Sequence, residues 1–340
     1  MNATINLEKE HFPVLLDELI SIISPLYGGS FIDCTFGHGG YSKKILENKS
    51  NKVFAIDRDL KSLKIAEKLK KQFINRLNFE INTFSKIGNI KIEKKNIKAI
   101  IFDLGYSLSQ IKDPTKGLSF NHKGKLNMKM GLNNYSAHEV INNLSEDSLI
   151  KVFKTFGEEK MSKKIAKKII IERKKKNILN EDLVKIIDEV KKFRKTKVHN
   201  STKIFQSLRI FVNKEISELI YGLINSFKIL PTGSIIAVIT FHSIEDKIVK
   251  FFFRHYSEDK KTSRYLPDQK SPNKLFKLIK KKPILPSLSE ISKNPSSRSA
   301  KLRYGIKINN TNNFEEFLNK FKYLIEIENL SKKLWKKFIL

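Results

Sequence analysis

Short apolar runs alternate with helical patterns through the first hundred residues of the chain. The runs are four or five residues long and rich in Ile, Val, Phe and Leu, as expected of buried strands. The segments between them carry apolar residues at helical spacing. This alternation predicts a parallel, doubly wound α/β sheet. The predicted strands are residues 31–34, 53–57, 77–81 and 99–102, and the predicted helices are 10–30, 41–48, 59–71 and 85–93.

The pattern changes after Asp103. A loop-like stretch at 106–134 is followed by helical segments with no strand between them, which predicts a helical insertion. The alternation of strands and helices then returns, and an amphipathic helix or helix pair at 313–340 is expected to dock on the α/β domain. The later predicted helices are 138–154, 158–173, 181–193, 203–228 and 313–340, and the later strands are 235–239 and 302–308. We therefore divide the chain into an α/β domain at 1–110 and 203–310, an inserted helical domain at 111–202, and an extension at 311–340.

Acidic residues and a glycine-rich turn fall where the predicted strands end. Three of the four residues from Gly37 to Gly40 lack a side chain, so a ligand can lie against the backbone there. Asp57 follows Gly37 by 20 residues, a distance at which an acid binds ribose hydroxyls in nucleotide-binding units. The carboxyl ends of parallel strands share one edge of a sheet. We expect a common crevice lined by Asp33, Gly39, Asp57, Phe84 and Asp103.

The turn is not a complete G-x-G-x-x-G motif, because Tyr41 and Ser42 follow the glycines. This departure disfavours NAD and favours another adenosine-bearing ligand. An ordinary tight turn without a ligand is the alternative that the motif alone leaves open.

The net charge of +31 is the most informative feature of the composition, because such a surplus of basic residues favours a polyanionic partner. Lysine accounts for 57 of the 66 basic residues, which is also typical of an A/T-rich genome. That bias does not explain the shortage of acids, so nucleic acid is the expected partner.

Several classes of protein are disfavoured by the same sequence. No apolar run approaches the ~20 residues of a membrane span, and residues 1–10 lack the apolar core of a secretory signal. A single cysteine, Cys34, excludes an intrachain disulfide framework, and the histidines show no metal-ligand spacing. We expect a cytoplasmic protein with no bound metal.

His242, Ser243, Glu245 and Asp246 resemble the components of a hydrolase triad, but triads assemble from distant segments rather than from five consecutive positions. We expect these residues to cap the following helix and to line the crevice at the fifth strand.

Motifs spread along the chain resemble those of the small-subunit ribosomal RNA cytosine-N4 methyltransferases. They run in order and with the family's spacing from about His11 to Ile308. The matching segments are 33–40, 55–59, 102–105, 117–120, 126–130, 155–159, 205–213, 241–250 and 294–303.

The resemblance implies a Rossmann-like, class I S-adenosylmethionine-dependent methyltransferase domain with an inserted all-α domain. It implies methylation of the exocyclic N4 of a cytosine in the decoding centre of 16S rRNA, within the small ribosomal subunit. The family's cofactor contacts fall on Gly39, Gly40, Tyr41, Asp57, Phe84, Asp103 and Gln110. Asp57 would hold the ribose hydroxyls, Phe84 would pack on the adenine, and Asp103 and Gln110 would lie nearer the adenine edge or the methyl-donor end. The amine must also lose a proton, and Asp103 is the candidate acceptor.

The chain departs from the family pattern at three places. Tyr41 stands where His is frequent, Leu108-Ser109 where Ser-Pro is usual, and Asn127 where Asp is expected, which removes a carboxylate near the presumed substrate side. One alternative is therefore a non-catalytic ribosome-assembly factor that keeps the fold. A DNA cytosine-N4 methyltransferase is less favoured, because Asp103-Leu104-Gly105-Tyr106 lacks that class's Pro-Pro-aromatic motif. The sequence leaves open whether the chain forms a homodimer.

Overall fold

The computed structural model describes residues 13–24, 27–192, 199–257, 274–311 and 313–332. The chain forms two compact units. One comprises residues 1–108 and 225–312 and is called the sheet unit here; the other comprises 109–224 and 313–340 and is called the helical unit.

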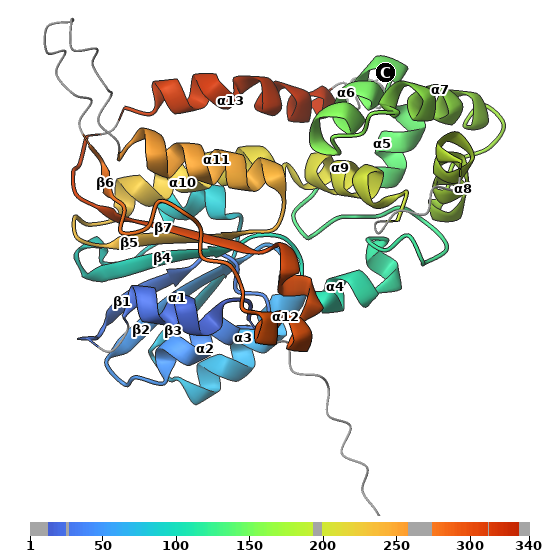
Figure 1. The fold of residues 1–340 in the computed structure, drawn as a ribbon. Coiled ribbons are helices and arrows are strands. Elements are labelled where there is room, and N and C mark those ends of the chain that lie inside the picture. The colour runs from blue at the N-terminus through green and yellow to red at the C-terminus, as the bar shows by residue number, and fades with distance from the viewer. Residues whose placement is uncertain (1–12, 25–26, 193–198, 258–273, 312, 333–340) are drawn as a thin grey trace, which may run out of the picture. The chain divides into compact units, whose positions relative to one another are not determined.

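The sheet unit holds a seven-stranded sheet in the order β3-β2-β1-β4-β5-β7-β6 (Figure 1). The strands are β1 (Gly29–Asp33), β2 (Asn51–Asp57), β3 (Leu77–Ile81), β4 (Ile97–Asp103), β5 (Ile235–Thr240), β6 (Phe276–Lys277) and β7 (Lys301–Lys307). Strands β1 to β5 are parallel, which confirms the predicted doubly wound arrangement. The strand order reverses between β1 and β4, and ligands of such sheets bind outside the carboxyl ends at that point.

The last two strands correct the prediction of a parallel sheet, because β7 runs antiparallel to both β5 and β6. Strand β7 alternates polar and apolar residues over much of its length, as suits an edge region that is not covered equally on both faces. By contrast, the centre of β4 is apolar throughout and fully buried.

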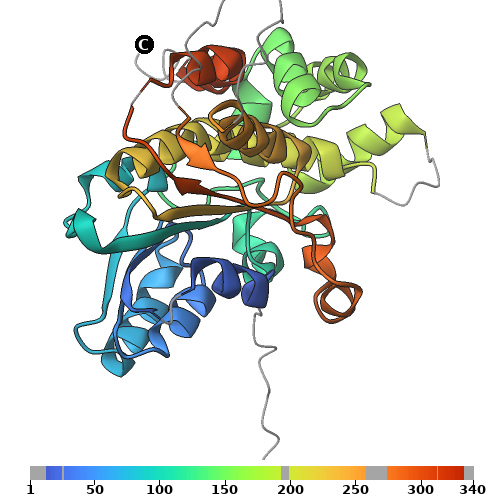
Figure 2. The same ribbon diagram turned by 60° about the vertical axis from the view of Figure 1, so that its left-hand side comes forward.

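Helices cover both faces of this sheet (Figures 1 and 2). On one face lie α1 (Leu16–Ile23), α2 (Gly40–Leu46) and α3 (Lys61–Gln72), and on the other lies α11 (Ser243–His255). The apolar stripes of α1, α2 and α3 and the strands beneath them enclose a core that includes Phe31, Ile45 and Ile101. The unit also contains α12 (Leu288–Lys293) and the 3-10 helices η2 (Phe84–Asn89), η3 (Lys94–Asn96) and η5 (Pro295–Ser299).

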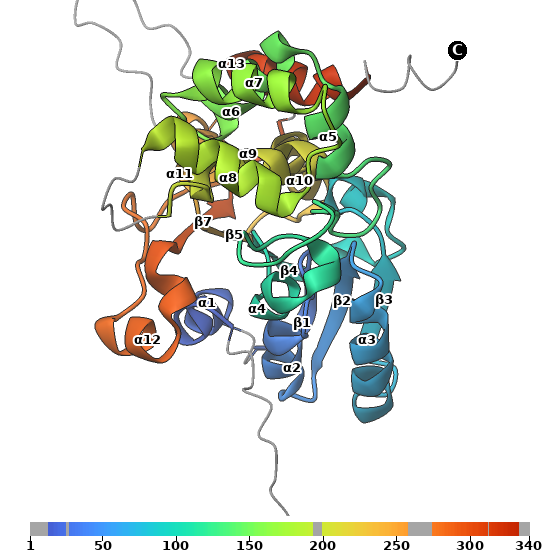
Figure 3. The same ribbon diagram turned by 90° about the vertical axis from the view of Figure 1, so that its right-hand side faces the viewer.

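In the helical unit, α6 packs on α7 and α9 (Figure 3). This unit contains most of the remaining helices that the structure describes. They are α4 (Leu108–Lys112), α5 (Ala137–Asn143), α6 (Glu146–Phe156), α7 (Ser162–Glu172), α8 (Asn180–Lys191), α9 (Thr202–Asn213), α10 (Glu215–Ile229) and α13 (Glu315–Glu328), with the 3-10 helices η4 (Pro114–Lys116) and η6 (Asn329–Ser331). Helix α10 starts in this unit and ends in the sheet unit.

Two helices predicted as continuous are each interrupted. Ser145 accepts a hydrogen bond from the backbone N–H of Ser148 and starts α6, so the predicted helix 138–154 is two helices. Lys214 adopts a left-handed conformation, with φ 50°, and separates α9 from α10 within the predicted helix 203–228.

The compact units also differ from the predicted division at residue 202. Helix α9 buries Ile204, Phe205 and Leu208, and it packs on α5 and α6, so it belongs with the helical unit. Helix α13 packs on α6 in the same unit rather than on the α/β domain as expected. Among the helices that the structure describes, none combines the length and the apolar character needed to cross a membrane.

Candidate functional site

Three aspartates end neighbouring strands at one edge of the sheet. Asp33 ends β1, between Ala55 of β2 and Ile101 of β4, and both of those strands continue for two residues to Asp57 and Asp103. The structure thus confirms that these acids, predicted from separate segments, meet at the same edge.

The glycine turn is attached to this edge by backbone hydrogen bonds. Phe36 N–H donates to the carbonyl oxygen of Ile56 at 3.0 Å, and Gly37 N–H donates to Asp57 Oδ2 at 2.6 Å. Asp57, which follows Gly37 by 20 residues, therefore holds the glycine turn directly. The spacing in the sequence predicted ribose binding for this acid and not this structural role.

The three glycines of this turn are needed for different reasons. A Cβ on Gly39 would come within 2.6 Å of Leu69 Cδ1, and a Cβ on Gly40 would come within 2.2 Å of Pro13 Cγ. At Gly37, with φ 53°, the nearest heavy atom to an added Cβ would be the Thr35 carbonyl oxygen at 3.9 Å. Protein packing requires the second and third glycines, whereas only the first leaves open space beside the backbone.

Asp57 is half-buried and engages two backbone donors. Its Oδ1 accepts from Asp59 N–H at 2.8 Å while its Oδ2 accepts from Gly37 N–H. Burial raises the pKa of Asp57, and these hydrogen bonds oppose that rise. Each carboxylate oxygen has further acceptor capacity, so the group remains able to accept hydroxyl donors.

Asp103 is the least satisfied acid of the three. Its backbone N–H donates to Thr35 Oγ1 at 2.7 Å, and its Oδ2 lies 3.2 Å from the Tyr41 hydroxyl. Its Oδ1 is buried and has no hydrogen-bond partner among the residues that the structure describes. Burial raises the pKa of Asp103 to about 8, the Tyr41 contact opposes this, and the negative charges of Asp33 and Glu245 add to it.

Asp33 is buried completely, which corrects the expectation that it lines the crevice. Its Oδ1 accepts from Thr35 N–H at 3.2 Å and its Oδ2 accepts from the Ser42 hydroxyl at 2.7 Å. Burial raises the pKa of Asp33 to about 6. This residue fixes the turn and the start of α2.

Tyr41, a predicted cofactor contact, has a buried side chain. Its side chain is only 3% exposed and belongs to the core, where its hydroxyl donates to the Val14 carbonyl oxygen at 2.5 Å. The sequence analysis missed two residues that hold this site together. Thr35 accepts a hydrogen bond from the backbone of Asp103, and Val14 accepts one from the Tyr41 hydroxyl. Neither residue is acidic, and no motif marked them.

Phe84 and Gln110 complete the predicted set. Phe84 opens η2, is half-buried, and meets Phe102 edge-to-face with ring centroids 5.4 Å apart. Gln110 lies in α4 and belongs to the helical unit.

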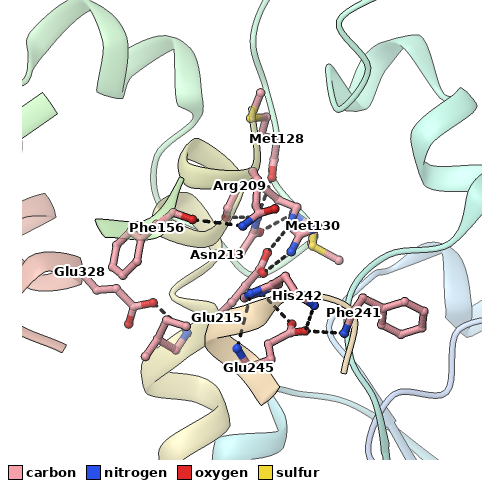
Figure 4. Close-up of polar contacts among 12 residues, drawn as sticks. Met128, Met130, Phe156, Arg209, Asn213, Glu215, Phe241, His242, Glu245 and Glu328 are labelled. Carbon is pink, nitrogen blue, oxygen red and sulfur yellow. Dashed lines mark hydrogen bonds and ion pairs between the residues drawn. The ribbon is translucent and has the colours of Figure 1, made fainter. Parts of the chain in front are cut away.

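His242 and Glu245 cap α11, as predicted (Figure 4). Glu245 Oε2 accepts from the backbone N–H groups of Phe241 and His242, at 2.8 and 3.3 Å, and Glu245 N–H donates to His242 Nδ1 at 3.4 Å. Asp246 pairs instead with Lys301 and Arg303 of β7. These residues form a cap and a cross-link between elements, which excludes the triad interpretation.

In the helical unit, two of the segments singled out in the sequence are joined by one side chain (Figure 4). Asn213 Oδ1 accepts from Met130 N–H at 3.0 Å, and its Nδ2 donates to the Met128 carbonyl oxygen at 2.9 Å. Nearby, Arg209 pairs with Glu215 at 2.8 Å. The motifs at 126–130 and 205–213, which are far apart in the sequence, are therefore in direct contact within the helical unit.

Asn127 has a structural partner of its own. Its Nδ2 donates to the Thr115 carbonyl oxygen at 2.9 Å. An aspartate at this position would place an acceptor against an acceptor, so the amide suits the loop as it is folded here.

The residues at the strand ends fit an adenosine-bearing, positively charged ligand. Asp57 offers acceptors for hydroxyl groups, and Phe84 offers a half-buried aromatic ring. Asp103 has a buried oxygen that no described residue hydrogen-bonds. Together with the reversal of strand order at β1 and β4, these features define a ligand-binding α/β domain of the doubly wound class.

Known proteins of one family are similar to this chain over most of its length. The profile of the MraW methylase family matches residues 8–308. A ribosomal RNA small subunit methyltransferase H from Rickettsia bellii is 41% identical over 89% of this chain and 100% of its own length. The protein of the same description from Ehrlichia ruminantium is 41% identical over 88% of this chain and 99% of its own length. Among solved structures, an rRNA methylase from Streptococcus thermophilus is 13% identical, covers 86% of this chain and 96% of its own, and has a TM-score of 0.35.

The chain belongs to the MraW methylase family. The resemblance seen in the sequence is confirmed, and so is S-adenosylmethionine as the cofactor of this methyltransferase.

Proposed function

We propose that the protein methylates the exocyclic N4 of a specific cytosine in the decoding centre, near the P site, of 16S rRNA in the small ribosomal subunit. The observation that carries this proposal is the buried Oδ1 of Asp103, which has no hydrogen-bond partner in the described part of the chain and lies at the same sheet edge as the glycine turn held by Asp57. The names of relatives matched over their full length, and the net charge of +31, support an RNA substrate in a cytoplasmic ribosomal particle.

The cofactor would be held by groups from several elements. Gly39 and Gly40 shape the turn, Asp57 would accept from the ribose hydroxyls, and Phe84 would pack on the adenine ring. Asp103 and Gln110 would lie nearer the adenine edge or the methyl-donor end. S-adenosylmethionine supplies an already activated methyl group on a positively charged sulfur.

Asp103 has the properties of a proton acceptor for this reaction. As the N4 lone pair forms the new bond to the methyl carbon, the electron pair of the old carbon–sulfur bond stays on sulfur. The nitrogen must then release one proton. A carboxyl group whose pKa is about 8 is near the working pH, where a general base is effective. A cationic ligand beside it would lower the pKa of Asp103 and favour the ionised form that accepts the proton.

Positioning supplies the rest of the rate enhancement. Alignment of the amine with the methyl carbon replaces an improbable bimolecular encounter. A base within a stacked RNA cannot reach strand ends buried in a protein, so the cytosine must leave its stack.

The test uses purified protein, isotopically methyl-labelled S-adenosylmethionine, and small ribosomal subunits that lack the modification. Mass spectrometry of the digested RNA then locates the label. We expect label on N4 of one decoding-centre cytosine, its loss in Asp103→Ala, and its retention in the matched carboxyl variant Glu328→Gln of the helical unit.

Two results would reject the proposal. Absence of label despite measurable cofactor binding would favour the non-catalytic assembly factor, particularly if Asp57→Ala still associated with subunits. In a parallel assay that offers DNA, label on cytosine N4 of the DNA together with none on the ribosomal RNA would favour the DNA methyltransferase.

A further inference from the structure

The hydroxyl group of Tyr41 lies between two oxygen atoms and has one proton to share. It is 2.5 Å from the Val14 carbonyl oxygen and 3.2 Å from Asp103 Oδ2. A carbonyl oxygen only accepts hydrogen bonds, so the shorter contact uses the phenolic proton. The longer contact is then a hydrogen bond only when Asp103 carries a proton and donates it to the phenol oxygen.

Ionisation of Asp103 changes this arrangement. A charged carboxylate only accepts, so a hydrogen bond between the two side chains then requires the phenolic proton to turn from Val14 to Asp103. Hydrogen bonds to charged groups are stronger than those between neutral groups, so the charged partner competes effectively with the carbonyl. Burial and the neighbouring carboxyl groups raise the pKa of Tyr41 well above its usual value, which keeps the proton on the phenol.

The Val14 carbonyl is held in place by the segment around it. Leu15 N–H donates to Glu290 Oε1 of α12 at 2.8 Å, and Pro13 packs on Gly40 at the start of α2. The second acceptor available to Tyr41 is therefore a fixed part of the sheet unit.

We propose that Tyr41 is a positioning residue for methyl transfer, because its hydroxyl group holds the Asp103 carboxyl group in place. The phenolic hydrogen bond moves from the Val14 carbonyl to Asp103 when Asp103 ionises. This exchange sets the pH at which Asp103 ionises. The proposal rests on the proposed function for its link to catalysis, but the proton exchange itself is a property of the protein alone. Other charged groups face the pair: Asp33 from β1 and Glu245 from α11 face Asp103, and Asp33 and Glu290 face Tyr41. Asp33 and Glu245 are acidic, so they favour the protonated form of Asp103, and Tyr41 is the neighbour that opposes them.

The test compares Tyr41→Phe with Tyr135→Phe. Tyr135 is also buried, and its hydroxyl donates to a backbone carbonyl, that of Phe211, at 3.1 Å. Both substitutions remove one buried hydroxyl and keep the ring, so their folding can be matched by thermal unfolding. The primary readout is the pKa of Asp103 from carboxyl-carbon NMR of the full chain without ligand.

We expect the pKa of Asp103 to rise by about one unit in Tyr41→Phe and to stay within a few tenths of a unit in Tyr135→Phe. Where methyl transfer is measurable, the ionisation that limits its rate at low pH should move upward by the same amount, with the affinity for S-adenosylhomocysteine changed less than threefold. An unchanged pKa in folded Tyr41→Phe would overturn the proposal whether or not ribosomal RNA is the substrate. A shifted pKa with no methylation by the unaltered protein would reject the proposed function alone.

Discussion

Asp103 at the end of β4 and Glu328 at the end of α13 are alike in one respect and opposite in another. Burial raises the pKa of each carboxyl group to about 8. Glu328 uses both oxygens, since Oε1 accepts from Ile216 N–H at 2.8 Å and Oε2 accepts from Ser217 N–H at 2.9 Å. Asp103 leaves its Oδ1 without a partner among the described residues.

The difference in hydrogen bonding separates a structural carboxyl group, Glu328, from Asp103, which we propose to be functional. Glu328 closes the amino-terminal end of α10, where backbone N–H groups lack partners within their own helix and favour a negative charge. Asp103 has no such structural task for its second oxygen, and buried polar atoms without a partner are rare enough to need a reason. A shifted pKa alone would not distinguish these two residues, whereas their hydrogen bonds do.

The largest expected effect of this comparison is on catalysis. Asp103→Asn removes the proposed proton acceptor while keeping the size of the side chain, so single-turnover methyl transfer should fall by about 10²-fold or more. Glu328→Gln makes the same chemical change in the helical unit and should keep the rate within about threefold. Equal losses of rate in two folded variants would remove the distinction.

The second expected effect is on stability, and here we expect the Glu328 variant to lose more than the Asp103 variant. Glu328→Ala leaves two backbone donors of α10 without their partner and should lower the free energy of unfolding by about 2–3 kcal/mol in urea. Asp103→Ala, which leaves no backbone donor unpaired, should cost less. A smaller loss for Glu328→Ala than for Asp103→Ala would contradict the structural role of Glu328.

The third expected effect is on the pH dependence of stability, to which both Asp103 and Glu328 contribute. Each of the two carboxyl groups has a higher pKa in the folded chain than in the unfolded chain, so the folded state binds its proton more tightly. Their contributions are fully present below about pH 4 and are lost as the pH rises towards about 8. Replacing either group by its amide should flatten the decline between pH 5 and 7.5 by about 1.4 kcal/mol per pH unit, measured in urea at several pH values.

The smallest effects concern the glycine turn, where packing and ligand binding can also be separated. Gly39→Ala would force a Cβ against Leu69 and Phe36 at a φ of 75°, so we expect a stability loss of about 2 kcal/mol. Gly37→Ala meets open space and should cost about 1 kcal/mol from its positive φ alone.

Cofactor affinity, measured by calorimetry, should fall for Gly37→Ala at temperatures where the variant is fully folded. Unchanged affinity there would show that the space beside Gly37 is not used by the ligand.

The sequence predicted much of this architecture because strong local patterns agree with the tertiary structure. The strand at 77–81 was predicted with its observed bounds, and the acids ending β2 and β4 were correctly placed at a common edge. Breaks within helices were missed, because Ser145 and Lys214 interrupt patterns whose apolar spacing continues across them. The direction of β7 depends on pairing with β5 and cannot be read from its own residues.

Side-chain roles at the site were less predictable than positions. Asp33, Asp57 and Asp103 look equivalent in sequence, yet their burial and hydrogen bonds give them three different tasks. The family resemblance gave Tyr41 as a cofactor contact, and the first turn of α2 directs its side chain into the core. Such distinctions arise from partners such as Thr35 and Val14, which lie in other elements of the fold.

The most direct test of the account is a carboxyl-carbon NMR titration of Asp103 and Glu328 in one sample, with and without S-adenosylmethionine. A positively charged ligand at the strand ends should lower the pKa of Asp103 by about one unit or more. The pKa of Glu328 should change by no more than a few tenths of a unit. Saturating ligand that leaves the pKa of Asp103 unchanged, or that shifts both groups equally, would contradict the assignment of Asp103 to the methyl-transfer site.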